Sequence, residues 1–101
     1  MSKLRVAVIG CGMIANSAHF PALNILRDEG ILEVVGVADI RVDVAEETAK
    51  RHNVPAFYAD PQQMLDELHP DFVAVCTPNA YHKKWTIAAL KAGAHVACEK
   101  P

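Results

Sequence analysis

The feature that most constrains the fold of this chain is a continuous apolar run that ends in a glycine turn. Residues 4–9 read Leu-Arg-Val-Ala-Val-Ile, and Gly10 and Gly12 follow directly. Unbroken runs rich in β-branched residues are typical of strands that are buried on both faces of a parallel sheet. Parallel strands need crossover connections, so the rest of the chain is expected to alternate helices with strands.

The remaining sequence shows this alternation. Apolar runs predict further strands at 32–38, 56–58, 72–76 and 95–98, and helical spacing predicts helices at about 13–26, 42–51, 61–68 and 81–92. Asp60 followed by Pro61 is typical of a helix start, and Gly93 suits a helix end. Right-handed crossovers then predict an α/β fold, a doubly wound parallel sheet of the Rossmann type with strand order 3-2-1-4-5. At 101 residues, we expect one dinucleotide-binding domain spanning 1–101.

The composition excludes several classes of protein. A net charge of -2 gives no electrostatic basis for binding nucleic acid or an anionic membrane, and no apolar run reaches the length of a membrane span. The cysteines Cys11, Cys76 and Cys98 form neither a CxxC pair nor a metal-ligand pattern, so we expect no metal site. Their odd number, with no secretion signal, predicts reduced thiols in the cytoplasm.

The turn after the first predicted strand carries the first functional motif. Residues 10–15 read Gly-Cys-Gly-Met-Ile-Ala. Gly10 permits a tight turn, and Gly12 leaves room for a pyrophosphate beside the backbone. The N–H groups near Met13 and Ile14 then face the phosphates from the positive end of a helix. The order of strand, glycine turn and helix favours a dinucleotide site over a purely structural turn.

An acidic residue follows the second predicted strand. Asp39 can accept hydrogen bonds from the adenine ribose hydroxyls and repels a 2′-phosphate, which favours NAD over NADP. Arg41 leaves alternatives open: its guanidinium can pair with a 2′-phosphate, stack on adenine, or be a solvated residue at a helix start. The sequence therefore predicts NAD as the cofactor.

Two further motifs follow the fourth and fifth predicted strands. Residues 76–82 read Cys-Thr-Pro-Asn-Ala-Tyr-His, in a loop that faces the first strand where ligands bind doubly wound sheets. Thr77 and Asn79 offer polar groups and Pro78 stiffens the loop, although Asn79 and Pro78 equally suit a helix start and a strand end. Lys100, within Glu-Lys-Pro at 99–101, either reaches a nicotinamide or substrate hydroxyl or is a solvated lysine.

Together and in this order, these motifs resemble the N-terminal half of the glucose–fructose oxidoreductase / inositol dehydrogenase (Gfo/Idh/MocA) family. The resemblance covers essentially the whole chain, and Glu-Lys-Pro after Ala-Gly-Ala-His-Val is its most specific element. It implies an NAD(P)-dependent oxidoreductase that moves a hydride between a nicotinamide cofactor and a sugar, polyol or cyclitol. Lys100 would then be catalytic, orienting the substrate and assisting proton transfer from a Lys-Pro peptide that is commonly cis in the family.

The resemblance also implies a set of cofactor-binding residues. The turn would cradle the pyrophosphate, Asp39 would hold the adenine ribose, and the loop after the fourth strand would line the cleft. By its spacing alone, His82 is more readily a surface or half-buried histidine. The full set is Gly10, Cys11, Gly12, Met13, Ile14, Asp39, Arg41, Thr77, Pro78, Asn79, His82, Glu99 and Lys100.

Family members continue past Glu-Lys-Pro with a final strand and a second α/β domain that holds the substrate, so this chain resembles a truncated piece. Two alternatives stay open: an NAD-dependent glycosidase of the same family, and a non-catalytic nucleotide-binding module. The expected partners are NAD(H) and, for the full-length parent, a sugar-like small molecule. We also expect self-association through the strand at 95–98, if it forms an open sheet edge.

Overall fold

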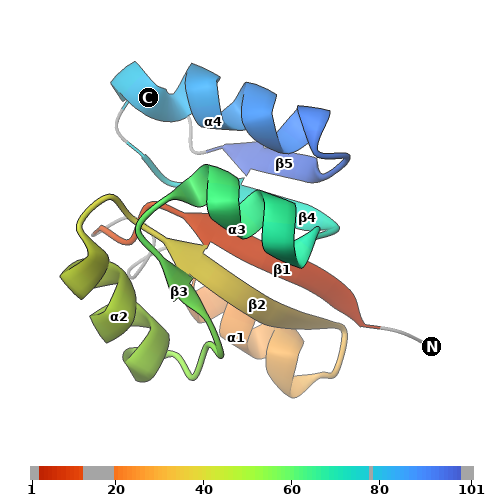
Figure 1. Ribbon diagram of the computed structural model, residues 1–101. Helices are drawn as coiled ribbons and strands as arrows, with labels where there is room; N and C mark the ends of the chain where they lie inside the picture. Colours follow the sequence, from red (N-terminus) through yellow and green to blue (C-terminus); the bar gives the residue numbers. More distant parts are fainter. Residues whose placement is uncertain (1–2, 13–19, 78, 99–101) are drawn as a thin grey trace.

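The computed structural model of the chain describes residues 3–12, 20–77 and 79–98. Within these ranges, strands and helices alternate along the chain (Figure 1). The strands are β1 (Leu4–Ile9), β2 (Leu32–Ala38), β3 (Phe57–Tyr58), β4 (Phe72–Val75) and β5 (His95–Cys98). The helices are α1 (Phe20–Asp28), α2 (Val42–Arg51), α3 (Pro61–Leu68) and α4 (Asn79–Lys91).

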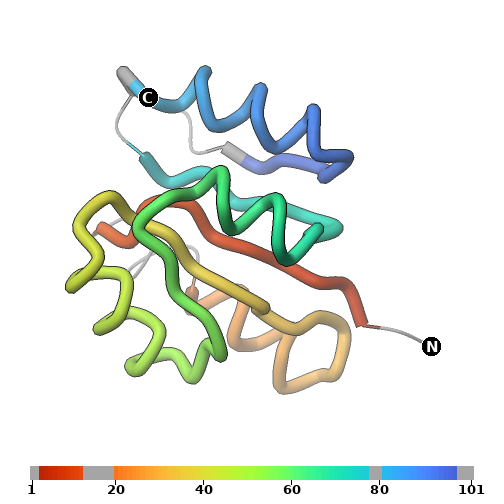
Figure 2. Tube along the Cα trace, viewed as in Figure 1, coloured from red at the N-terminus to blue at the C-terminus, as the bar shows by residue number. Residues whose placement is uncertain are grey.

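The strands form one parallel sheet with the order β3-β2-β1-β4-β5, which confirms the predicted Rossmann topology. Figure 2 follows the chain outward from β1 to β2 and β3, then back across to β4 and β5. The carboxyl end of β1 therefore lies where the direction of winding reverses, which is where ligands bind folds of this kind. β5 is an outer strand of the described sheet, and self-association through it stays a prediction.

Side chains of β1 alternate between two apolar cores, one on each face of the sheet. Val6 and Val8 pack with residues of α1 and α2, whereas Ala7 and Ile9 pack with residues of α3 and α4. Figure 1 shows α1 behind the sheet and α3 in front of it. The central strand is thus buried on both faces, as its unbroken apolar run predicts.

β2 contains one residue more than its pairing with β1 requires. The partners of Val6 and Ala7 are Val34 and Gly36, so the pairing passes over Val35. An extra residue of this kind is a β-bulge, which bends the strand and interrupts its alternation. Despite the extra residue, the side chains after the bulge stay in step with their partners on β1. Val37, for example, is paired with Val8.

Two arginines at the amino-terminal edge of the sheet hold the ends of helices. The guanidinium of Arg5 donates to the backbone carbonyl of Leu68, the last residue of α3. The guanidinium of Arg27 donates to the carbonyls of His52 and Asn53, just after α2. Helix ends leave such carbonyls unpaired, and a cation there also suits the helix dipole. These contacts secure two helices from the edge opposite the glycine turn.

The contact between α1 and the end of α2 contains a stacked ring pair. The ring centroids of Phe20 and His52 are 4.0 Å apart, with 3° between the ring planes. Burial, together with the charges of Arg51 and Arg27, lowers the pKa of His52 below its usual value of 6.5. The folded chain therefore favours the neutral imidazole.

We expect this ring pair to make stability depend on pH. Because the pKa of His52 is lower in the folded than in the unfolded chain, its contribution is complete above a pH of about 6.5 and is lost as the pH falls below that value. Urea denaturation at about pH 7.5 and about pH 5.5 measures the loss across the range in which histidine titrates. A His52→Phe variant keeps the stack without titrating and should lose less stability over that interval; an equal loss in both proteins would contradict the assignment.

Some observed boundaries differ from the predicted ones. β4 ends at Val75 rather than Cys76, although the Cys76 N–H still donates to the Ile9 carbonyl at 2.7 Å. β3 is one residue shorter than predicted, and α4 begins two residues earlier, at Asn79. The first predicted helix begins outside the described residues, and α1 extends to Asp28. Apolar spacing detects the core-facing part of an element, whereas its solvated ends leave no such signal.

Candidate functional site

A cleft of about 530 Å³ opens beside the carboxyl end of β1. Its volume is in the range of small-molecule sites, about 300–1,000 Å³. The lining brings together residues from separate parts of the sequence that the motifs single out: Gly10, Gly12, Asp39, Arg41 and Thr77. The fold therefore joins the glycine turn, the acidic residue after β2 and the loop after β4 in one place.

The two glycines of the turn have different surroundings. Gly10 has a φ of +93°, and a Cβ built there would lie 2.8 Å from the carbonyl carbon of Cys76. Among the described residues, no atom would lie within 4 Å of a Cβ built on Gly12. The fold itself thus requires glycine at position 10, whereas the described residues leave space for a side chain at position 12.

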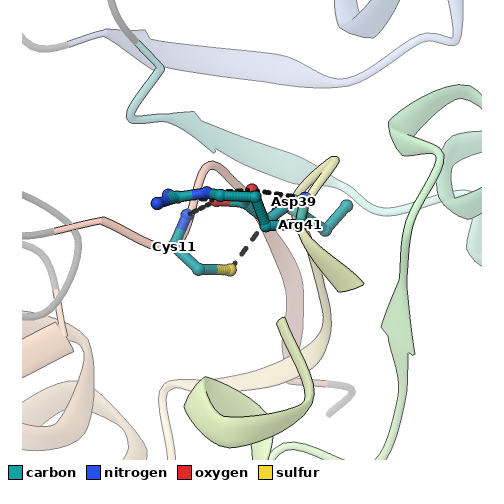
Figure 3. Close-up of polar contacts among 4 residues, drawn as sticks. Cys11, Asp39 and Arg41 are labelled. Carbon is teal, nitrogen blue, oxygen red and sulfur yellow. Dashed lines mark hydrogen bonds and ion pairs between the residues drawn. The ribbon is translucent and has the colours of Figure 1, made fainter. Parts of the chain in front are cut away.

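Asp39 connects the end of β2 to the glycine turn (Figure 3). Its side chain is only 7% exposed, and its Oδ2 accepts a hydrogen bond from the backbone N–H of Cys11 at 3.0 Å. Its Oδ1 accepts from the backbone N–H of Arg41 at 2.9 Å. Burial raises the pKa of Asp39, but the hydrogen bonds from Arg41 and Cys11 outweigh it and hold that pKa below its usual range. The side chain is therefore a carboxylate at neutral pH.

The Arg41 guanidinium lies against the same carboxylate (Figure 3). Its Nε donates to Oδ1 of Asp39, and its Nη2 donates to Oδ2, each at 3.2 Å. The Arg41 side chain is 61% exposed, in contrast to the buried carboxylate that it covers. The guanidinium therefore covers the acidic group from the solvent side.

Cys11 contributes its backbone rather than its thiol. The side chain is packed in the α1–α2 core, and its Sγ lies 3.6 Å from the Ala38 carbonyl oxygen. Burial, followed by the charge of Asp39, raises the pKa of this thiol to about 12. Because the thiolate is the nucleophilic form, Cys11 is unreactive at neutral pH.

The loop after β4 places only part of its predicted set in the cleft. Thr77 lines it, whereas the half-buried His82 does not. The reason is helical geometry: Tyr81, Lys84 and Trp85 are spaced i, i+3 and i+4 and share the face of α4 that lines the cleft, and His82 lies off that face. Among the described residues, no hydrogen-bond partner reaches the buried Oγ1 of Thr77, so this hydroxyl is available to a ligand.

One wall of the cleft consists of residues that were not among the predicted site residues, although Tyr81 belongs to the motif at 76–82. α4 supplies Tyr81, Lys84 and Trp85, while Ile40 and Pro61 come from the loop after β2 and the start of α3. The Nζ of Lys84 lies 4.7 Å from the centroid of the Trp85 ring. The sequence does contain a pattern that could have predicted this wall. Tyr81, Lys84 and Trp85 follow the predicted ligand-binding loop at the spacing of one helix face.

For the other predicted site residues, the structure does not show how the side chains lie relative to the cleft. Asn79 is the first residue of α4, and the roles of its side chain and of the undescribed residues stay predictions. The predicted site residues outside the described ranges are Met13, Ile14, Pro78, Glu99 and Lys100.

Two kinds of feature are absent from residues 3–12, 20–77 and 79–98. No group of three or more His, Cys, Asp or Glu side chains there is arranged to hold a metal ion. No helix in those ranges has both the length and the apolar character needed to cross a membrane.

Comparison with known proteins gives consistent matches. The model of the oxidoreductase family with an NAD-binding Rossmann fold, GFO_IDH_MocA, matches residues 4–101. D-glucoside 3-dehydrogenase of Escherichia coli strain K12 is 43% identical over 100 residues, which are 99% of this chain and 28% of that protein.

Solved structures agree. The WlbA dehydrogenase from Chromobacterium violaceum, in complex with NADH and UDP-GlcNAcA, has a TM-score of 0.87 at 34% identity, covering 98% of this chain and 28% of that one. A variant of a 3-ketoreductase from Actinomadura kijaniata, in complex with TDP-benzene and NADP, has a TM-score of 0.85 at 35% identity, covering 99% of this chain and 31% of that one. The chain thus spans less than a third of the length of these relatives.

Proposed function

This chain belongs to the Gfo/Idh/MocA oxidoreductase family, and from this membership we propose that it is the nicotinamide-cofactor domain of a dehydrogenase acting on a sugar, polyol or cyclitol. The observation that carries the proposal is the 3.0 Å hydrogen bond from the Cys11 N–H to the Asp39 carboxylate. This bond holds the glycine turn and the acidic residue side by side, which is the pairing that a dinucleotide's pyrophosphate and adenine ribose require.

The described residues fit such a cofactor at two points. No side chain of the described residues lies within 4 Å of a Cβ built on Gly12, which suits the close approach of a pyrophosphate to the backbone there. The ionised Asp39 offers the acceptor that the ribose hydroxyls need, at the end of β2. We place the pyrophosphate beside Gly12 and the adenine ribose beside Asp39.

The wall of the cleft suits the adenine ring. Ile40 is 74% exposed and Tyr81 is 51% exposed, although both are large apolar side chains at the edge of the cleft. Flat rings bind well against aromatic and aliphatic side chains, and a bound ring would remove this apolar surface from water. We therefore place adenine between the loop after β2 and the first turns of α4.

For the chemical step, we propose Lys100 as the residue that handles the substrate proton. A bound nicotinamide supplies the hydride acceptor in the oxidative direction. In its unprotonated form, the Lys100 amine would take the hydroxyl proton of the substrate as the carbonyl forms. Lys100 follows β5, whose parallel pairing with β4 directs its carboxyl end to the same edge as the cleft.

Cofactor preference should depend on Asp39. In an Asp39→Ser variant, we expect NADH affinity to fall about tenfold or more, because a hydrogen bond to a charged group is lost. NADPH should gain relative to NADH, because repulsion of its 2′-phosphate is removed and Arg41 is released. Titration of both cofactors by fluorescence measures the ratio.

The matched control is Asp28→Ser, which removes an exposed carboxylate at the end of α1 and should leave both affinities unchanged. An unchanged NADH to NADPH ratio in Asp39→Ser would refute the ribose assignment.

A further inference from the structure

We propose that Arg41 is a built-in competitor for the ribose subsite: in the free protein its guanidinium covers the Asp39 carboxylate, and it has to leave before a ribose can bind there. The inference rests on the proposed function, since it assumes that Asp39 receives the adenine ribose. It assigns Arg41 a role opposite to that of a cofactor ligand when the cofactor is NAD.

The Asp39 carboxylate is already saturated with hydrogen-bond donors. Among the described residues, Asp39 accepts from the backbone N–H groups of Cys11 and Arg41 and from Nε and Nη2 of the Arg41 side chain. An ionised carboxylate has about four lone-pair sites, so none is left for a ribose hydroxyl. Two of the four donors have to withdraw before a ribose can make two hydrogen bonds.

Of these four donors, the two on the Arg41 side chain are the ones that can withdraw. The two backbone N–H groups are fixed by the turn after β1 and by the start of α2, and moving them would disturb the fold. The Arg41 side chain is 61% exposed and has solvent around it. Because the guanidinium is exposed, water can solvate it when it leaves the carboxylate, whereas moving either backbone group would disturb the fold. A ribose therefore displaces the side chain of Arg41 and leaves the backbone contacts in place.

The two cofactors differ in what they offer the released guanidinium. NAD breaks the ion pair and offers the guanidinium no partner of comparable charge at that position. NADP carries a 2′-phosphate there, to which the released guanidinium can donate charge-assisted hydrogen bonds. Displacing the guanidinium therefore weakens the binding of NAD, whereas with NADP the new contacts to the 2′-phosphate compensate for the loss. Arg41 thus reduces the difference in affinity by which Asp39 favours NAD over NADP.

The test is an Arg41→Met variant, which keeps much of the length of the side chain but has no donors. Titration with NADH should show binding at least about twofold tighter than in the wild type, because the ribose no longer has to displace a guanidinium from Asp39. NADPH should bind more weakly than to the wild type. The matched control is Arg51→Met, which removes a similarly exposed arginine that pairs with Glu47 on α2 and should change neither affinity.

An Arg41→Lys variant keeps the positive charge but cannot make the bidentate hydrogen bonds to Asp39. Its affinity for NADH should lie between those of the wild type and Arg41→Met. It also provides a second reading if Arg41→Met folds poorly, which thermal denaturation would reveal. Weaker or unchanged NADH binding in the folded Arg41 variants would overturn the inference while leaving the proposed function standing. A wild-type chain that binds neither cofactor would overturn both.

Discussion

Replacing Gly12 with valine should abolish measurable NADH binding while leaving the chain folded. No atom of the described residues lies within 4 Å of a Cβ built on Gly12, so we expect the fold to tolerate a side chain at this position. A branched side chain would occupy the space in which we place the pyrophosphate and would hold it away from the backbone N–H groups. We expect an affinity loss of at least about a hundredfold, which corresponds to about 2.7 kcal/mol.

Fluorescence titration with NADH measures this loss, and urea denaturation of the same variant shows whether the fold is intact. Gly12→Ala provides a graded control, because one methyl group should weaken binding less than the valine side chain does. A folded Gly12→Val chain with wild-type affinity would show that the pyrophosphate does not bind at this turn.

Replacing Gly10 with alanine should mainly lower the stability of the fold, whereas replacing Gly12 with valine should mainly lower the affinity for NADH. Position 10 has a φ of +93°, and an added Cβ would lie 2.8 Å from a backbone carbonyl carbon of Cys76. Neither the backbone of Cys76 nor that of Thr77 can turn aside as a flexible side chain would. Backbone strain and overpacking each cost about 1–3 kcal/mol, so we expect a loss of roughly 3 kcal/mol or more.

A loss of this size is a large part of the total stability of a small domain, about 5–15 kcal/mol. Chemical denaturation measures it against Gly12→Ala, which adds the same methyl group two residues away, where no atom of the described residues lies within 4 Å of it. This variant should change stability by less than about 1 kcal/mol. Equal stability of the two alanine variants would contradict the assignment of Gly10 to the fold and Gly12 to the ligand.

The architecture was predictable because the elements are bounded by residues with clear local preferences. β1 stops at a glycine, β2 stops at an acidic residue, and α3 begins at Pro61 with the Asp60 side chain accepting from the Gln62 N–H. Alternating strands and helices with right-handed crossovers then leave little freedom in topology. The family resemblance, now confirmed, rests on the same motifs.

Other features depend on contacts that no local pattern records. Val34 and Val35 are both apolar, so the sequence does not indicate which residue of β2 the pairing passes over. The Arg5 and Arg27 contacts join residues 63 and 25 positions apart in sequence, and any surface arginine would have looked the same. In the cleft, the presence of α4 was predictable, but the orientation of its residues depends on how the helix packs on the sheet.

The pairing of Arg41 with Asp39 illustrates the same limit at the site. Both residues are visible in the sequence as candidates for the ribose subsite, and the open question was whether the guanidinium contacts the cofactor. Only the folded chain shows that its nearest partner is the acidic group itself. An acid and an arginine two residues apart are therefore better interpreted as one unit than as two independent ligands.

The bulge in β2 has a consequence for how this strand can vary in length during evolution. Deleting Val35 would make Val34 and Gly36 consecutive partners of Val6 and Ala7, which is the pattern of a regular ladder. Every later side chain, including that of Asp39, would keep its face. Elsewhere in a buried strand, loss of one residue turns all the following side chains to the opposite face. The middle of β2 is thus a position at which lineages can gain or lose a residue inside the core without losing the carboxylate at the end of the strand.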